Sequence, residues 1–347
     1  MKKLFALLLS VMMVLSLAAC SSNKTEDNNS TAGDNSAPVA DRNTVSKIAV
    51  ILPGSITDQS WNQSAYEGLM TIESQGYEVA YTENVDVATA EAVARSYAEE
   101  GFDFIIGHGA QYGQAICNVA EDFDTVNFFI TGNAPEDIAE EDLPKNIMFA
   151  DYRECEGAYV SGVIAALMTQ TGVVGYIGGG NNTTQQSDKN AFVEGVKSIN
   201  ANVEVKTVIT GTFDDSNLGY ETAKAMHEAG ADVILQTCDH TGLGALQYCS
   251  ENGVWCIGYT SDQSALVEGG KMLTSMLIDI PFMISSQTDL IKAGNYGGQS
   301  FPGLHDGVVS IAAFSSEMPE EVATQVNDII AKIVAGEIVV TPNYSEN

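Results

Sequence analysis

A tryptophan among polar residues follows the first apolar run of the chain. Trp61 has Asp58 before it and Asn62 and Gln63 after it, and an apolar run at 47–52 precedes them. An aromatic ring with hydrogen-bonding neighbours suits a ligand site, in which the ring stacks on a flat ligand and polar groups hold its edge. Two other interpretations stay open: Trp61 as a core residue capping the next helix, and Asp58 as the N-cap of that helix.

Other polar or aromatic residues stand where further strands are expected to end. Ligands of open α/β sheets bind beyond the carboxyl ends of the strands, so these residues are candidates for the same site. Each is explained equally well as a solvated loop residue or a helix cap. The candidates are His108, Tyr112, Asn133, Asp151, Tyr152, Asn182, Asp239 and His240.

The sequence patterns of common enzymes are missing. There is no G-x-S-x-G, HExxH or GxxxxGK[ST] motif, and Gly107-x-Gly109 lacks the further glycine of a dinucleotide-binding loop. The four histidines are scattered, without a pair four residues apart that could ligate a metal. We therefore expect a binding protein that is not an enzyme and holds neither a cofactor nor a metal.

The elements that must position the candidates alternate between apolar strands and helices, as in parallel α/β sheets. Strands are expected at 47–52, 77–81, 102–106, 127–131, 146–150, 173–177, 203–209, 232–236 and 254–258. Helices are expected at 62–75, 88–100, 112–122, 154–169, 187–199, 216–229 and 242–252. The segment 65–68 is echoed at 191–195, with one residue inserted, which predicts two similar lobes.

The fold class expected from this pattern is α/β, with two doubly wound parallel-sheet lobes joined by a hinge. We expect lobe 1 to comprise 46–170 with about 272–306, and lobe 2 to comprise 171–271 with about 307–347. The carboxyl ends of the two sheets would face a common cleft, and the hinge would close the lobes around a ligand.

The first residues have the pattern of an export signal. Lys2 and Lys3 precede an apolar segment that ends at Leu17, and two alanines then precede Cys20. This ending resembles a bacterial lipobox, which implies that residues 1–19 are removed and that Cys20 carries a diacylglyceryl anchor. Two acyl chains give stable anchoring, so we expect a protein on the extracytoplasmic face of the cell membrane. A plain signal peptide that happens to end in cysteine stays open.

The segment 20–45 is rich in Ser, Asn and Asp and carries almost no large apolar residues. It cannot bury enough surface to offset the entropy of ordering, so we expect a flexible tether between the lipid and the lobes.

The chain is strongly acidic, with 46 Asp and Glu against 15 Lys and Arg and a net charge of −31. This charge repels nucleic acid and anionic lipid, so the lipid anchor is the one membrane contact that we expect. We also expect a monomer. The cysteines besides Cys20 are odd in number and mostly lie in apolar stretches, which predicts buried free thiols; a Cys249–Cys256 bridge stays open.

A series of short motifs runs in a specific order from about residue 47 to 335. The motifs are 58–68 (DQSWNQSAYEG), 149–152, 156–162, 174–179, 211–215, 230–234, 257–258, 261–263 and 273–275. Together they resemble the basic membrane protein family of lipoproteins, which includes a purine nucleoside receptor. The resemblance implies the type 1 periplasmic binding protein fold and capture of purines for the permease of an ABC importer.

The resemblance also implies roles for two aromatic residues. The family has an aromatic residue at the position of Trp61 that stacks on the base. His240 falls where the nucleoside receptor has its second stacking aromatic, so the base would lie between Trp61 and His240.

This sequence departs from the nucleoside-binding pattern at two positions. Thr260 stands where that pattern has an aspartate that grips ribose hydroxyls, and Ile278 stands where it has a lysine. The run from Gly258 to Asp262 looks more like the branch of the family that binds a free base. We therefore expect a purine nucleobase first and a nucleoside second, with Thr260 and Asp262 as further candidates for ligand contact.

Two alternatives stay open. A receptor of the same fold could bind a sugar or a signalling furanose, which would require carboxylates that converge with Trp61. A surface antigen or adhesin would instead require an exposed apolar patch and no polar cleft.

Overall fold

The computed structural model describes residues 42–267 and 271–346. The expected signal peptide at 1–19, the lipidation site Cys20 and the tether up to residue 41 lie outside the described residues. Within the described ranges, none of the helices combines the length and the apolar character that a bilayer span requires.

The first sheet has six strands in the order β11-β5-β4-β3-β1-β2, and every neighbouring pair is parallel. Its central strands are continuous apolar runs that are buried on both faces, as parallel sheets require. The strands are β1 (Lys47–Ile51), β2 (Glu78–Thr82), β3 (Phe104–Gly107), β4 (Asn127–Ile130), β5 (Ile147–Ala150) and β11 (Gly298–Ser300).

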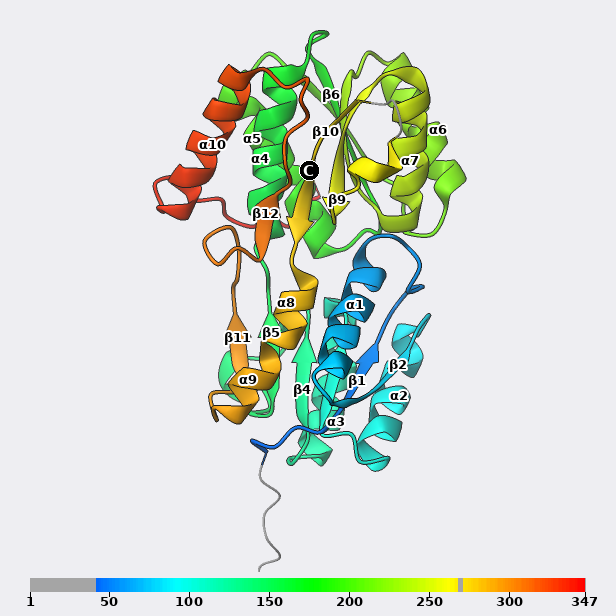
Figure 1. Cartoon of the computed structure of the whole chain (residues 1–347), viewed down its shortest axis with the longest axis vertical. Helices are drawn as coiled ribbons and strands as arrows, with labels where there is room; N and C mark the ends of the chain where they lie inside the picture. The colour runs from blue at the N-terminus through cyan, green and yellow to red at the C-terminus, as the bar shows by residue number, and fades with distance from the viewer. Residues whose placement is uncertain (1–41, 268–270, 347) are drawn as a thin grey trace, which may run out of the picture. The chain divides into compact units, whose positions relative to one another are not determined.

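Helices cover both faces of this sheet (Figure 1). One face packs against α1 (Trp61–Ser74), α8 (Ile280–Ser285) and α9 (Gln287–Lys292). The other packs against α2 (Val87–Glu99) and α3 (Gly113–Asp122). Short 3-10 turns lie at Ala110–Tyr112, Glu140–Asp142 and Ser264–Leu266.

The second sheet has six strands in the order β12-β10-β9-β8-β6-β7, with only β10 and β12 antiparallel. The strands are β6 (Val173–Gly178), β7 (Glu204–Ile209), β8 (Val233–Thr237), β9 (Trp255–Thr260), β10 (Lys271–Ile278) and β12 (Val309–Ile311). The helices α4 (Glu154–Met168), α5 (Thr183–Ile199) and α10 (Glu320–Val334) lie on one face, with α6 (Ser216–Glu228) and α7 (Asp239–Asn252) on the other (Figure 1).

The helices α4 and α5 pack backbone to backbone. A Cβ atom on Gly162 would meet the carbonyl oxygen of Phe192, and a Cβ atom on Gly195 would meet that of Tyr159. Because any larger residue would push the helices apart, these two glycines set the distance between them.

The chain crosses between the sheets after β5, after β10 and after β11. Backbone hydrogen bonds join the crossing segments: Asp151 N donates to Ser300 O (3.0 Å), and Asp279 N donates to Val308 O (2.7 Å). These crossings give two α/β lobes joined by a hinge, so the expected fold class is confirmed by the architecture.

The positions of α4 and β10 differ from the expected lobe boundaries. We expected residues up to 170 in lobe 1, but α4 is apolar on nearly all sides and packs against α5, α10 and β10. We expected lobe 1 to resume at 272, but β10 pairs with β9 in the second sheet. The first two crossings therefore fall near 151–153 and 279, and the third lies between β11 and β12.

Two residues at the end of the expected tether contact the first lobe. Val45, assigned to the tether, is buried in the core, and the carbonyl oxygen of Arg42 accepts a hydrogen bond from Asn127 Nδ2 at 2.8 Å. The cysteines 117, 155, 238, 249 and 256 are free and buried, as the apolar surroundings of most of them predicted, so Cys249 and Cys256 form no bridge.

Candidate functional site

A cavity of about 920 Å³ lies at the carboxyl ends of the strands of both sheets. Its wall comes from the loops after β1, β2, β3, β4 and β5 of the first sheet, and from β9 and the loops after β6, β7 and β8 of the second. A cavity of this size accommodates a ligand as large as a base or a nucleoside.

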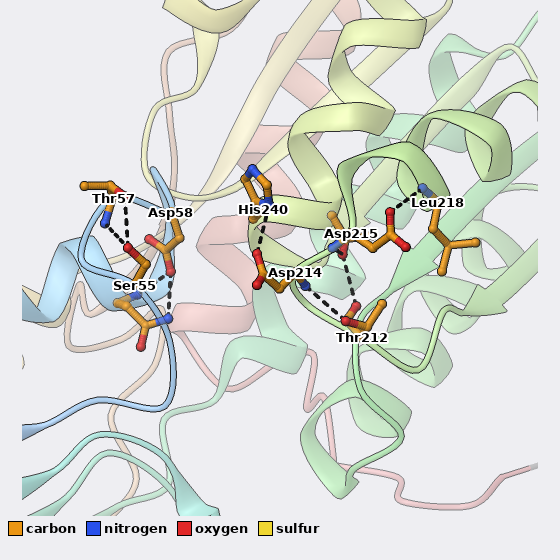
Figure 2. A network of polar contacts seen from close by, with 10 residues as sticks. Ser55, Thr57, Asp58, Thr212, Asp214, Asp215, Leu218 and His240 are labelled. Atoms are coloured by element: carbon orange, nitrogen blue, oxygen red, sulfur yellow. Dashed lines mark hydrogen bonds and ion pairs between the residues drawn. The ribbon is translucent and has the colours of Figure 1, made fainter. Parts of the chain in front are cut away.

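The loop after β1 is fixed by one carboxylate. Asp58 Oδ1 accepts hydrogen bonds from the backbone N–H of Ser60 (2.9 Å) and Gln63 (3.0 Å), and Oδ2 accepts from the N–H and Nδ2 of Asn62 (2.8 and 2.7 Å). Asp58 thus satisfies the free amides at the start of α1 while it also faces the cavity (Figure 2). The two interpretations of this residue are therefore compatible.

Trp61 lies on the cavity wall in a group of three aromatic rings. Its indole stacks on the imidazole of His108, with ring centroids 4.2 Å apart and planes inclined by 20°. The ring of Tyr152 is tilted against it by 33° at 5.5 Å. Trp61 is half-buried, so the structure supports its interpretation as a wall residue over that as a core residue.

His108 supports Trp61 from behind instead of lining the cavity. It is fully buried, with Nε2 3.0 Å from the carbonyl oxygen of Trp61 and Nδ1 2.8 Å from the hydroxyl of Thr131. Burial lowers the pKa of His108 to about 3, so the ring is neutral at physiological pH. Its role is to hold the tryptophan.

The second lobe faces Trp61 with the start of α7. His240 is 44% exposed, and its Nδ1 lies 3.0 Å from Asp214 Oδ1 (Figure 2). Asp239 is buried and lies close to Ser60, Asp58 and the backbone of Trp61. Burial, followed by the charge of Asp58, raises the pKa of Asp239 to about 7.

The structure adds a buried carboxyl group that the sequence analysis missed. Glu154, at the first position of α4, lines the cavity, is 2% exposed, and accepts a hydrogen bond from Tyr259 OH at 3.0 Å. Burial raises its pKa to about 7, and the pKa of the neighbouring Asp188 on α5 lies well above its ordinary value for the same reason. The signal in the sequence was an acidic residue at a helix start, three positions after Asp151.

The structure brings most of the sequence candidates together. The candidates that line the cavity are Asp58, Trp61, Asn62, Asn133, Asp151, Tyr152, Asn182, Asp239 and His240. Asn182 also caps α5, because its Oδ1 accepts from Gln185 N at 2.9 Å. Wall residues that sequence reasoning did not find include Asn84, Glu136, Glu154, Phe213 and Tyr259.

Five candidates lie off the wall. Besides His108, Tyr112 is in the core and donates its hydroxyl to the carbonyl of Val85. Gln63 donates to Glu67 on the surface of α1 (2.9 Å), Asp262 accepts from Ser264 N in its own loop (3.0 Å), and Thr260 is buried with φ of 67°. The sequence could place each residue in a loop, but not decide which way its side chain turns.

Comparison with known proteins decides the family. Residues 45–343 match the family described as ABC transporter substrate-binding protein PnrA-like. The chain belongs to this Bmp family. The resemblance found in the sequence motifs is thereby confirmed, and the family consists of solute-binding proteins instead of enzymes.

Relatives of this Bmp-family chain include proteins with different names. It is 27% identical over 310 residues to the ABC transporter nucleoside-binding protein BmpA of Lactococcus lactis subsp. cremoris, which covers 82% of this chain and 87% of that protein. It is 28% identical over 291 residues to the transcriptional activator protein med of Bacillus subtilis, which covers 82% of this chain and 88% of that protein.

A solved structure shows the same fold. The solute-binding protein of an ABC transporter system from Conexibacter woesei superposes with a TM-score of 0.72 at 24% identity, covering 87% of this chain and all of that one. The lobes and their crossings are thus those of a periplasmic binding protein.

Proposed function

We propose that this protein captures a purine in the cavity between its lobes and delivers it to the permease of an ABC importer. The observation that carries the proposal is the position of Trp61, an aromatic face on the wall of a cavity rich in hydrogen-bonding groups. A purine is a flat ring with polar edges, and stacking on an aromatic side chain contributes about 1–3 kcal/mol per base.

The wall offers more than one aromatic face. Tyr152, Phe213, Tyr259 and His240 line the same cavity as Trp61, so a flat ligand could be held from both sides. Because His240 comes from the second lobe and Trp61 from the first, a base between them would favour the closed arrangement of the lobes.

We favour a nucleobase over a nucleoside, because the residues expected to hold ribose are replaced. Thr260 and Ile278 are both 2% exposed, and neither lines the cavity. Neither position therefore supplies a charged group that could hydrogen-bond to the hydroxyls of a sugar. The nucleoside-binding relative supports the ligand class and leaves this choice between base and nucleoside to experiment.

The proposal includes a lipid anchor at Cys20 that holds a monomeric binding protein at the extracytoplasmic face of the membrane. It rests on the lipobox-like segment before Cys20 and on the family of substrate-binding proteins.

The test is titration of the full chain with adenine, adenosine and ribose, followed by calorimetry. We expect adenine to bind more tightly than adenosine, and ribose not to bind. Trp61→Ala should weaken adenine binding by about 1–3 kcal/mol, because the stacking face is removed.

Trp255→Phe is the matched control, because Trp255 is buried in β9 under Lys271 and does not line the cavity. Quenching of indole fluorescence by adenine should persist in Trp255→Phe and vanish in Trp61→Ala. Unchanged affinity in Trp61→Ala would show that the ligand binds elsewhere.

A further inference from the structure

The wall of the cavity carries negative side chains without positive ones. Among the described residues that line it there is no Lys or Arg, while the acidic ones are Asp58, Glu136, Asp151, Glu154, Asp214 and Asp239. Asp58 accepts hydrogen bonds from the backbone amides at the start of α1, and Asp214 lies against His240. Glu154 is nearly fully buried, and among the described residues only Tyr259 OH donates to it, at Oε2.

Glu154 and Asp188 form a pair of carboxyl groups that lacks donors. Tyr259 OH reaches Glu154 Oε2, but no donor from the described residues reaches Glu154 Oε1 or either oxygen of Asp188. The two groups are close enough that the charge of Glu154 is one of the causes that raise the pKa of Asp188. Two neighbouring buried carboxyl groups cannot both be ionised without a positive partner, so the pair is short of positive charge.

The surroundings do not supply that charge. The groups near enough to interact electrostatically with the pair are phenols and acids: Tyr152, Tyr176, Tyr259, Asp151 and Asp239. The nearby cations are engaged elsewhere. Lys189 Nζ donates to Gln186 Oε1 (2.7 Å) and to Glu346 O (3.4 Å), and the Arg153 guanidinium lies over the Phe301 ring.

A buried acceptor without a donor selects for ligands that bring one. An N–H group placed at Glu154 would satisfy an acceptor whose burial is otherwise uncompensated. A carbonyl oxygen at the same place would be repelled by the ionised form of Glu154, which predominates above pH 7. A phosphate would be rejected by the whole wall, because no cation offsets its charge.

We infer that the cavity selects purines with an exocyclic amino group, which Glu154 on the wall receives with Asp188 behind it. The inference rests on the proposed function and specifies the kind of purine. It makes Glu154 a residue that determines specificity.

The test compares adenine with hypoxanthine, which carries a carbonyl oxygen in place of the amino group. Calorimetric titration of the full chain at pH 8, where Glu154 is mostly ionised, should show adenine bound at least about tenfold more tightly. Glu154→Gln should reduce or reverse this preference, because the amide N–H can donate to the carbonyl of hypoxanthine. Asp188→Asn should reduce the preference as well, and it replaces Glu154→Gln if that variant fails to fold in a thermal melt.

Glu194→Gln is the matched control, since it removes the same charge from an exposed position of α5 and should keep the preference of the unchanged protein. Equal affinities for adenine and hypoxanthine, or a preference unaltered in folded Glu154→Gln, would overturn the inference and leave the proposed function standing. Absence of binding by either purine would overturn both.

Discussion

Trp61 is held in place by neighbouring side chains, of which His108 lies behind it and Asp58 lines the cavity beside it. His108 stacks behind the indole and bonds to its backbone, and Asp58 fixes the amides on either side of it. A stacking face loses less entropy on binding when it is already ordered, so these neighbours contribute to affinity by holding the indole in position. The aromatic face is therefore a property of the whole loop after β1.

The buried carboxyl groups predict how stability depends on pH. The pKa of Glu154 is raised to about 7 in the folded state, against about 4.3 in an unfolded chain. The folded state therefore binds more protons than the unfolded state between these values, and the free energy of unfolding should fall as pH rises from about 4 to 7. Asp239 acts in the same direction.

Urea unfolding of the ligand-free chain at pH 5 and pH 8 measures this effect. Glu154→Gln should flatten the dependence, because its amide does not titrate, whereas the exposed Glu194→Gln should leave it unchanged. If Glu154→Gln loses as much stability between the two pH values as the unchanged protein, the pH dependence does not arise from Glu154.

Among the elements, the contact of α4 with α5 depends on single glycine residues. Gly195→Ala would place a methyl group against the backbone carbonyl oxygen of Tyr159. Because the contact is with backbone atoms, the clash can be relieved only if the two helices move apart. We expect a loss of about 1–3 kcal/mol or more in the free energy of unfolding. Glu194→Ala, one position away and exposed, is the control and should change stability by less than about 0.5 kcal/mol.

Chemical denaturation of Gly195→Ala and Glu194→Ala tests this predicted difference in stability. Equal midpoints for Gly195→Ala and Glu194→Ala would mean that the helices tolerate a larger separation. Such a result would also weaken the view that α4 holds Glu154 rigidly at the cavity.

The sequence predicted the elements well and the side-chain directions less well. Apolar runs such as 104–107 and 127–130 are buried on both faces, so composition alone identifies them as strands. The helices α5 and α7 begin at 183 and 239, earlier than the predicted 187 and 242, because their polar first turns resemble loops. Which lobe α4 and β10 join depends on long-range packing, and local sequence patterns do not contain that information.

In the candidate site as well, the sequence predicted the positions of the residues better than the directions of their side chains. The strand ends predicted where the wall would form, and Asp151, Tyr152 and Asn182 lie there. His108 and Tyr112 follow a strand as well, but their side chains turn into the core. Glu154 was missed because only the fold brings it beside Tyr259 and Asp188, which are distant in the sequence.

For the whole molecule, the proposed anchor gives a prediction about its place in the cell. Cys20→Ser removes the thiol that would carry the lipid, so the protein should move from the membrane fraction to the soluble extracytoplasmic fraction. Immunoblotting of cell fractions measures this shift, with Cys117→Ser, at a buried cysteine of the first lobe, as the control. Membrane retention of Cys20→Ser would mean that another feature holds the protein there.

The crossings of the chain also bear on how the protein is made. The first lobe takes β11, α8 and α9 from residues 280–300, so its sheet stays incomplete while the preceding part of the chain is being synthesised or exported. Until then α1 lacks the cover of α8, whose Pro281 backbone packs against Gly68. A chain that emerges from its N-terminus must be extended through β10 of the second sheet before the first lobe can complete its own sheet. Truncation before residue 280 should therefore leave an aggregation-prone intermediate instead of an independently folded first lobe.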